Sequence, residues 1–139
     1  IPQIYYGDEV GLKGGRDPDC RRTFPWNWQE VERRKSLHDY YSKVIDIRHR
    51  YPALRTGGFE TLLTEGRVYS FLRYNDEEKI IVVLNSENGE REVEIDLGPF
   101  GLDADAGFID EMDGETYRAE GGILKVSPAG GTGMVLVLR

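Results

Sequence analysis

Hydrophobic and polar residues alternate with a period of two along most of the second half of the chain. The clearest case runs from Glu92 to Leu97, where Val93, Ile95 and Leu97 alternate with acidic residues. Alternation of this kind predicts a strand that turns one face to a core and the other to water. The segment 80–84 is apolar on both faces, which predicts a central position in a sheet.

About eight strands are predicted in this half, each bounded by a turn signal such as Asn-Gly, Asp-Gly or Gly-Gly. They are Phe59–Thr64, Val68–Tyr74, Ile80–Asn85, Glu92–Leu97, Gly107–Met112, Thr116–Glu120, Ile123–Val126 and Met134–Leu138. The segment 99–106 is predicted to be an irregular loop. Many short strands with regular turns are typical of an antiparallel sandwich or barrel.

The first half contains a helical pattern over residues 37–51, where apolar residues recur every three or four positions. Pro52 is expected to end this helix. Its start is open between a capping box at Asn27 and a later start near Ser36. The apolar stripe needs a sheet to cover it, and the only strand predicted before it is Ile1–Tyr6. Strand and helix together predict one βα unit.

The predicted strand Ile1–Tyr6 ends at a glycine and opens into a polar loop, and parallel α/β sheets build sites at such strand ends. In this loop Asp17 and Arg21 are four residues apart, a spacing that lets an acid and a guanidinium hold each other in place. They offer an acceptor and a fork of donors to a ligand rich in hydroxyl groups. Trp26 and Trp28 add flat faces of the kind on which sugars stack. The alternative is an exposed ion pair that only orders the loop, worth ~0–1 kcal/mol.

Charge is divided unevenly over a chain whose net charge is −7. Residues 1–58 carry 11 basic against 8 acidic residues, and residues 59–139 carry 7 against 17. The acidic half would repel a phosphate backbone, so no nucleic acid partner is expected. The change in charge predicts a domain boundary near Gly57-Gly58. No apolar run approaches the ~20 residues that a membrane helix needs, so no membrane partner is expected.

Metal, disulfide and targeting signals are weak in this sequence. His38 and His49 are eleven positions apart, which on a helix separates them by about three turns, so we expect no shared metal ion. Cys20 is the only cysteine and has no internal disulfide partner. The first residues lack the pattern of a signal peptide. We expect a cytoplasmic protein, with secretion left open.

Four segments resemble the α-amylase superfamily, glycoside hydrolase family 13. IPQIYYGDEVGL resembles its eighth barrel strand, and GGRDPDCRRTFPW resembles the following loop, particularly in the neopullulanase, cyclomaltodextrinase and maltogenic amylase group. The helix LHDYYSKVIDIRHRYPALRTGGF and the closing GTGMVLVLR fit the same family. The resemblance covers essentially the whole chain, and its match is weakest over residues 90–120.

The resemblance implies an α/β plus all-β fold in two parts. Residues 1–58 would be the last βα unit of a TIM (β/α)8 barrel, and residues 59–139 a C-terminal antiparallel Greek-key β-sandwich. Members of the family cleave α-1,4-glucosidic bonds of cyclodextrins, pullulan or maltooligosaccharides with retention of configuration. In the family's D-P-x-x-R turn the Asp and Arg bind a glucose ring, which implies a substrate-binding role for Asp17 and Arg21.

The family's catalytic machinery has no counterpart in the matched segments. A nucleophile, an acid/base and a third carboxylate follow barrel strands four, five and seven, whereas this chain matches strand eight onward. We therefore expect no catalytic residue, no metal and no cofactor in these residues, and no hydrolysis by the chain alone. Its expected partners are an α-glucan and the N-terminal part of the barrel, and a homo-oligomer is left open. Asp8 and Glu9 are not expected to flank one bond, since neighbours in an extended segment point opposite ways. The resemblance implies that they order the rim of the site.

Two alternatives stay open at this point. The chain could be a non-catalytic carbohydrate-binding or packing module, for which Tyr69, Phe71 and Tyr74 are the candidate aromatics, although a place in the core explains them equally well. It could also come from another superfamily member that shares the strand-eight pattern, such as an oligo-α-glucosidase or a trehalose synthase.

Overall fold

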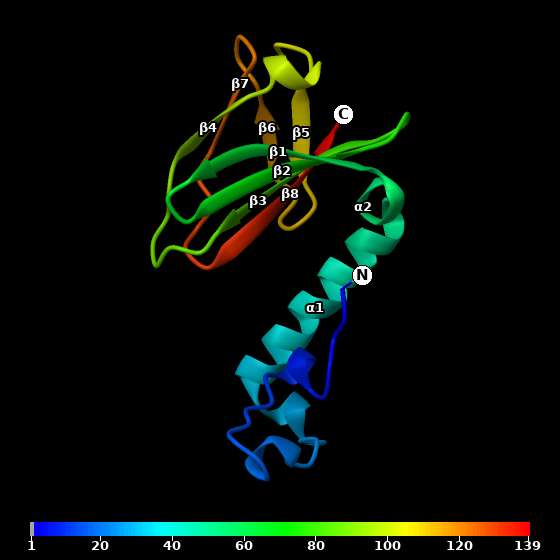
Figure 1. The fold of residues 1–139 in the computed structure, drawn as a ribbon, viewed down its shortest axis with the longest axis vertical. Helices are drawn as coiled ribbons and strands as arrows, with labels where there is room; N and C mark the ends of the chain where they lie inside the picture. The colour runs from blue at the N-terminus through cyan, green and yellow to red at the C-terminus, as the bar shows by residue number, and fades with distance from the viewer. Residues whose placement is uncertain (1) are drawn as a thin grey trace. The chain divides into compact units, whose positions relative to one another are not determined.

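The computed structural model describes residues 2–139 and divides into two compact units. The first extends to Asp46, and the second, which we call the strand unit, comprises Ile47–Arg139. Helix α1, Glu32–Arg50, begins in the first unit and ends in the second. Figure 1 shows the ribbon with its helices and strands labelled.

The first unit consists of loops, short helical turns and most of α1. Its three 3₁₀ turns are η1 (Asp8–Val10), η2 (Asp19–Arg21) and η3 (Trp28–Glu30). Residues 2–6 form no strand, so the prediction of a strand over Ile1–Tyr6 is wrong for the described residues; Ile1 itself lies outside them. A strand exists only when its backbone groups pair with a neighbouring strand, and in residues 2–139 no strand pairs with this segment. Its β-favouring side chains therefore do not suffice.

Helix α1 begins at Glu32, between the two predicted starts, and ends at Arg50, before Pro52 as predicted. The expected capping box at Asn27 is absent, because Asn27 precedes the separate turn η3 and its side chain caps nothing. A second helix, α2 (Ala53–Thr56), was not predicted. Pro52 stands immediately before it with φ −52°, a value that already suits a helix start. Pro52 thus ends one helix and opens the next.

All eight predicted strands are present in the strand unit. They are β1 (Gly58–Glu65), β2 (Val68–Tyr74), β3 (Lys79–Asn85), β4 (Val93–Asp96), β5 (Gly107–Asp110), β6 (Thr116–Arg118), β7 (Ile123–Val126) and β8 (Thr132–Leu138). The segment predicted as a loop holds one short turn, η4 (Gly98–Phe100). One antiparallel sheet has the order β1-β2-β3-β8-β5-β6, and a second pairs β4 with β7. β3 lies inside the larger sheet, as its two apolar faces predict.

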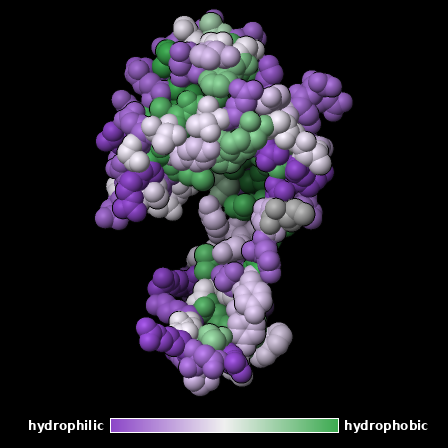
Figure 2. All heavy atoms as spheres, viewed as in Figure 1, coloured by the Kyte–Doolittle hydropathy of each residue, from purple (hydrophilic) through white to green (hydrophobic). Residues whose placement is uncertain are grey.

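The two sheets share one hydrophobic core. Val93 and Ile95 of β4 and Leu124 of β7 are buried in the same cluster as Phe108 and Leu136 of the larger sheet. The alternation of β4 is therefore confirmed, with apolar residues buried and acidic ones exposed. On the outside of the unit, hydrophobic residues (green) lie between hydrophilic ones (purple) in Figure 2. The result is a small, mostly β domain built of antiparallel sheets.

A second cluster lies on the other face of the larger sheet. Ile47 from the end of α1 and Ala53 and Leu54 from α2 pack with Ile80 of β3 and Val137 of β8. All of them are buried, with at most 8% of their surface exposed. The last turn of α1 therefore belongs to the strand unit.

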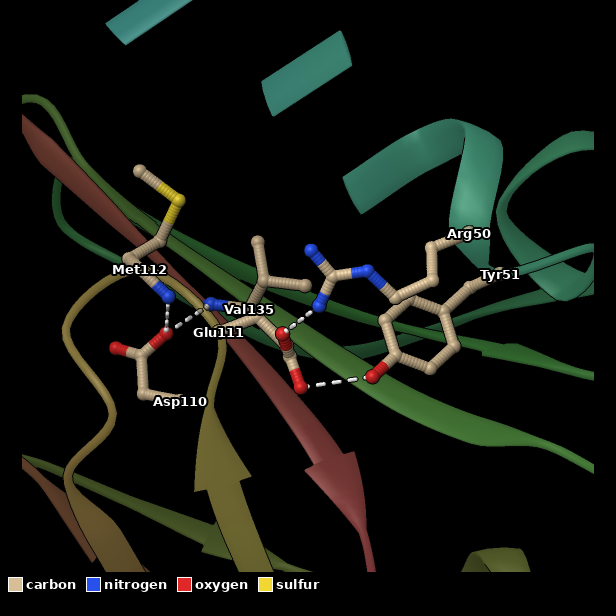
Figure 3. A network of polar contacts seen from close by, with 6 residues as sticks. All are labelled: Arg50, Tyr51, Asp110, Glu111, Met112 and Val135. Carbon is tan, nitrogen blue, oxygen red and sulfur yellow. Dashed lines mark hydrogen bonds and ion pairs between the residues drawn. The ribbon is translucent and has the colours of Figure 1, made fainter. Parts of the chain in front are cut away.

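Polar contacts fix the same helix end to the sheet (Figure 3). Glu111, which follows β5, accepts hydrogen bonds from the Arg50 guanidinium and from the Tyr51 hydroxyl, the latter at 2.7 Å. The neighbouring Asp110 is buried, and its Oδ1 accepts backbone N–H groups of Met112 and Val135, each at 2.9 Å. The carboxylate of Asp110 thus satisfies two backbone donors inside the sheet.

The pair Gly57-Gly58, near which the charge pattern predicts a boundary, is a close-packed joint. A Cβ on Gly57 would lie 2.5 Å from the Tyr74 carbonyl oxygen, and one on Gly58 would lie 2.5 Å from the Tyr74 ring. The Arg73 guanidinium also donates to both glycine carbonyls, at 3.0 Å each. The compact units divide earlier, after Asp46. The assignment of residues 1–58 to the end of a barrel stays a prediction.

Candidate functional site

The candidate site is the turn that begins at Asp17. The Asp17-Pro18 peptide bond is cis, and η2 follows it as a single turn of 3₁₀ helix. Arg21 Nη2 lies 2.7 Å from Asp17 Oδ1, so the ion pair predicted from the four-residue spacing is present. The two side chains are 75% and 64% exposed, respectively, and are open to a ligand.

A second ion pair lies in the same turn. Arg22 Nε and Nη2 donate to the two oxygens of Asp19 at 2.7 and 2.8 Å, the two-pronged geometry that suits a guanidinium and a carboxylate. The hydrogen bond from Arg22 holds the pKa of Asp19 below its ordinary value, and the same bond raises the pKa of Arg22. The backbone of Gly15 contributes less to the same lowering of the Asp19 pKa. Sequence reasoning missed this pair, although its i,i+3 spacing was visible.

Tyr6 joins the turn from the preceding segment. Its hydroxyl donates to the carbonyl of Arg22 at 2.7 Å. Among residues 2–139 Tyr6 is the one non-glycine residue with a positive φ, +44°. Such a conformation is unfavourable for a side-chain-bearing residue and calls for a local reason. The Tyr6 residue as a whole is 53% exposed.

The two tryptophans of the loop differ in how open they are. Trp26 is 82% exposed, and its ring lies 4.9 Å from that of Phe24 at a steep angle. Trp28 is half-buried and stacks on His38 with ring centroids 4.2 Å apart. Trp26 therefore keeps a face for a ligand, whereas one face of Trp28 is covered by His38.

Asp8 and Glu9 lie in the 3₁₀ turn η1, so the expectation of an extended segment at these residues is wrong. Asp8 Oδ2 accepts the backbone N–H of Tyr5 at 3.0 Å, which fixes the entry to η1.

Within residues 2–139, no group of three or more His, Cys, Asp or Glu could hold a metal ion. None of the helices in the described residues is long and apolar enough to cross a membrane.

A hollow of about 740 Å³ lies beside the turn within the first unit. Apolar residues such as Val10 and Leu37 form part of its wall. Its ionisable lining residues are all basic: Lys13, Arg22, Arg33 and Arg34. The Asp17–Arg21 pair is not in the wall. Arg22 therefore stands between the hollow and the exposed turn.

The aromatic side chains proposed for sugar binding in the strand unit contact neighbouring residues of the same unit. Phe71 stacks on Phe59 with centroids 5.0 Å apart and lies 5.7 Å from Tyr69 on its own strand. Arg73 covers Phe59 at 6.0 Å. Tyr74 packs against the core, and its hydroxyl hydrogen bonds to Glu60. Each ring thus has a neighbour in the same chain. These contacts argue against a carbohydrate-binding surface formed by the exposed faces of these rings.

Relatives of this chain are enzymes of α-glucan metabolism by name. An amylopullulanase of Thermoanaerobacter thermohydrosulfuricus is 36% identical over 99% of this chain, which covers 10% of that protein. A cyclomaltodextrinase of Thermoanaerobacter pseudethanolicus is 48% identical over 63% of the chain, 15% of that protein. Neopullulanase 2 of Thermoactinomyces vulgaris is 33% identical over 97% of the chain, 23% of that protein. The chain therefore spans at most about a quarter of the length of these relatives.

Solved structures agree. A structure titled cyclomaltodextrinase has a TM-score of 0.85 at 32% identity and covers 98% of this chain, which is 23% of that protein. An Anoxybacillus α-amylase has a TM-score of 0.84 at 28% identity and covers 97% of this chain, which is 28% of that protein. No family model matches the chain. The strand-rich domain matches the C-terminal domains of α-amylase-family enzymes. The chain belongs to the α-amylase superfamily, glycoside hydrolase family 13, and is similar to its neopullulanase, cyclomaltodextrinase and maltogenic amylase members.

Proposed function

We propose that this chain supplies a glucose-contacting turn to a retaining hydrolase of α-1,4-glucosidic bonds. One observation carries the proposal: Asp17 and Arg21 form a 2.7 Å ion pair on an exposed turn, at the positions where the resemblance implies sugar contacts. Relatives named amylopullulanase and cyclomaltodextrinase support an α-glucan as the substrate class.

The chemistry of the pair suits a sugar. Asp17 accepts hydrogen bonds from ring hydroxyls, while the guanidinium of Arg21 donates to their oxygens. The 2.7 Å ion pair places the acceptor and the donors side by side on the exposed turn. Hydrogen bonds to charged groups contribute ~1.5–3 kcal/mol each. The open face of Trp26 adds an apolar surface for the C–H face of a pyranose.

The proposal assigns the bond-breaking step to residues outside these 139. Retaining hydrolysis needs a nucleophile and an acid/base on opposite sides of the bond, about 5–5.5 Å apart. The resemblance places those acids after barrel strands four, five and seven, and this chain matches strand eight onward. In the same proposal residues 1–58 complete a (β/α)8 barrel, and residues 59–139 form its Greek-key C-terminal domain.

Binding of β-cyclodextrin to the 139-residue chain, measured by isothermal titration calorimetry, tests the sugar-contacting role. Asp17→Asn and Arg21→Gln are each expected to weaken binding at least about tenfold, since each removes hydrogen bonds between a charged group and the sugar. Asp76→Asn, an exposed turn residue of the strand unit, is the matched control and should bind as the parent chain does. Equal binding by Asp17→Asn and the parent chain would refute the role.

The same titration separates the binding-module alternative. If Phe59→Ala and Phe71→Ala weaken binding while Asp17→Asn does not, the strand unit carries the sugar and the turn does not. A reducing-sugar assay on the same samples addresses catalysis. We expect no product from the 139-residue chain with maltooligosaccharide, and clear turnover would place catalytic carboxylates within it.

A further inference from the structure

We propose that Tyr6, Asp19 and Arg22 are positioning residues that hold the Asp17–Arg21 pair in its sugar-binding arrangement. This inference rests on the proposed function, because it explains how the exposed pair is kept in register. None of the three needs to touch the ligand. They act on the backbone and on the neighbouring ion pair of the same turn.

The first contact comes from outside the turn. Tyr6 donates its hydroxyl to the carbonyl of Arg22, sixteen residues away, at 2.7 Å. Arg22 is the residue next to Arg21, so this bond fixes the backbone where the turn leaves η2. To make the bond, Tyr6 adopts φ +44°, and Gly7 after it adopts φ +85°. A strained backbone persists only where surrounding contacts determine it, and this hydrogen bond is such a contact.

The second contact closes the turn on itself. Asp19, at the start of η2, and Arg22, just after its end, are joined by two hydrogen bonds of 2.7 and 2.8 Å. Gly15 allows the approach of Asp19, because a Cβ at Gly15 would lie 2.8 Å from Asp19 Oδ2. Both contacts thus meet at Arg22, immediately after Arg21, and Asp19 lies between the two members of the pair. Asp19 is ionised at neutral pH, and its bond to Arg22 lowers its pKa further.

Asp17 and Arg21 need these additional contacts because their side chains are exposed to solvent. Asp17 and Arg21 are solvent-exposed side chains, and an exposed pair gains little from its own attraction. A single 3₁₀ turn has too few internal hydrogen bonds to be rigid by itself. Contacts from Tyr6 and the Asp19–Arg22 pair supply the missing order, so that a ligand meets a preorganised acceptor and donor.

The experiment uses the 139-residue chain and β-cyclodextrin. Tyr6→Phe removes only the hydroxyl, and Arg22→Gln removes the charge that pairs with Asp19. Each is expected to weaken binding about three- to tenfold, the effect of one lost hydrogen bond. Arg22→Lys keeps the charge but not the fork, so its binding should lie between that of Arg22→Gln and the parent chain. Tyr5→Phe, the neighbouring exposed tyrosine, is the matched control and should bind normally.

A second measurement reports on the pair without ligand. Nitrogen NMR signals of the Arg21 guanidinium are separate when the ion pair restricts its rotation and merge when rotation is free. We expect separate signals in the parent chain and in Tyr5→Phe, and merged signals in Tyr6→Phe and Arg22→Gln. A purely structural role elsewhere in the chain would leave the Arg21 signals unchanged.

The outcomes distinguish the two proposals. If Asp17→Asn abolishes binding while Tyr6→Phe and Arg22→Gln bind as the parent chain does, the positioning role is overturned and the sugar-contacting role stands. If Asp17→Asn has no effect on binding, or no binding occurs, the sugar-contacting role falls. The Arg21 signals then decide the positioning role alone: merged signals in Tyr6→Phe support it, and unchanged signals overturn it.

Discussion

The two compact units differ in where their order comes from. Of residues 2–46 only Gly7 and Val10 are buried, and the polar side chains of the turn pair with one another in solvent. The strand unit instead encloses two hydrophobic clusters, and the buried side chains of Asn85 and Asp110 hydrogen bond to its backbone. Burial therefore stabilises the strand unit, whereas short-range polar contacts shape the site. A surface that binds a ligand has to stay exposed, so burial cannot stabilise it.

One residue type shows the difference within a single chain. Asp110 is 1% exposed and accepts two backbone N–H groups, whereas Asp17 is 64% exposed and pairs with one guanidinium. The same carboxylate is a structural group in one unit and a candidate ligand contact in the other. Its surroundings decide which.

The largest expected effect is on the core of the strand unit. Phe108→Ala removes a side chain that is 1% exposed and is expected to lower the free energy of unfolding by ~3–5 kcal/mol, because it leaves a cavity between the sheets. Trp26→Ala removes an aromatic side chain that is 82% exposed and should cost less than about 0.5 kcal/mol. Urea unfolding followed by circular dichroism measures both. Similar losses would show that the first unit carries a core of its own.

The two aspartates give the next largest contrast. Asp110→Ala leaves the N–H groups of Met112 and Val135 without this acceptor and should lower the free energy of unfolding by ~2–3 kcal/mol. Asp17→Ala breaks only an exposed ion pair and should cost ~0–1 kcal/mol. The two variants are compared in the same urea series. A larger loss from Asp17→Ala than from Asp110→Ala would reverse the comparison between the units.

The smallest expected effects concern pH, and they have opposite signs in the two units. The pKa of Asp19 is lowered by its bond to Arg22, so this pair stabilises the turn above about pH 4 and its contribution is lost as pH falls through the lowered value. Burial raises the pKa of Tyr51 and of Tyr117, so their contribution is present below about pH 10 and is lost as pH rises through the raised values.

Thermal unfolding and NMR between pH 3 and about pH 11 measure these two limits. Acid is expected to perturb the signals of the turn first, and alkali is expected to lower the melting temperature of the strand unit. Tyr51→Phe is the control and should reduce the alkaline loss. If the melting temperature of the strand unit does not change as the tyrosines ionise, Tyr51 and Tyr117 do not contribute the expected loss of stability in alkali.

The sequence predicted the strand unit well because each strand carries its own signal. Alternation and turn residues fixed β2 and β7 at their observed bounds. The prediction failed over residues 2–6, where the outcome depends on a neighbour that β propensity cannot supply. It also missed α2, which at four residues is too short to show a period.

The candidate site was predictable only in part. The spacing of Asp17 and Arg21 predicted their ion pair, which is present. The role of Tyr6 could not be read from the chain, since its contact with Arg22 spans sixteen residues and depends on an unusual backbone conformation. Local spacing reveals neighbours along the chain, whereas contacts between distant segments require the fold.

The close packing at Gly57-Gly58 has a practical consequence for chimeric enzymes. A glycine pair at a change of charge resembles a flexible linker, and a linker is the usual place to join two domains in a chimera. Here the two glycines pack closely against Tyr74, and Arg73 donates hydrogen bonds to their carbonyls. The short helix α2 before them packs on the larger sheet. A graft that starts at residue 58 would strip Ala53 and Leu54 from Ile80 and Val137. A transplant of the C-terminal domain should therefore carry the end of the long helix with it.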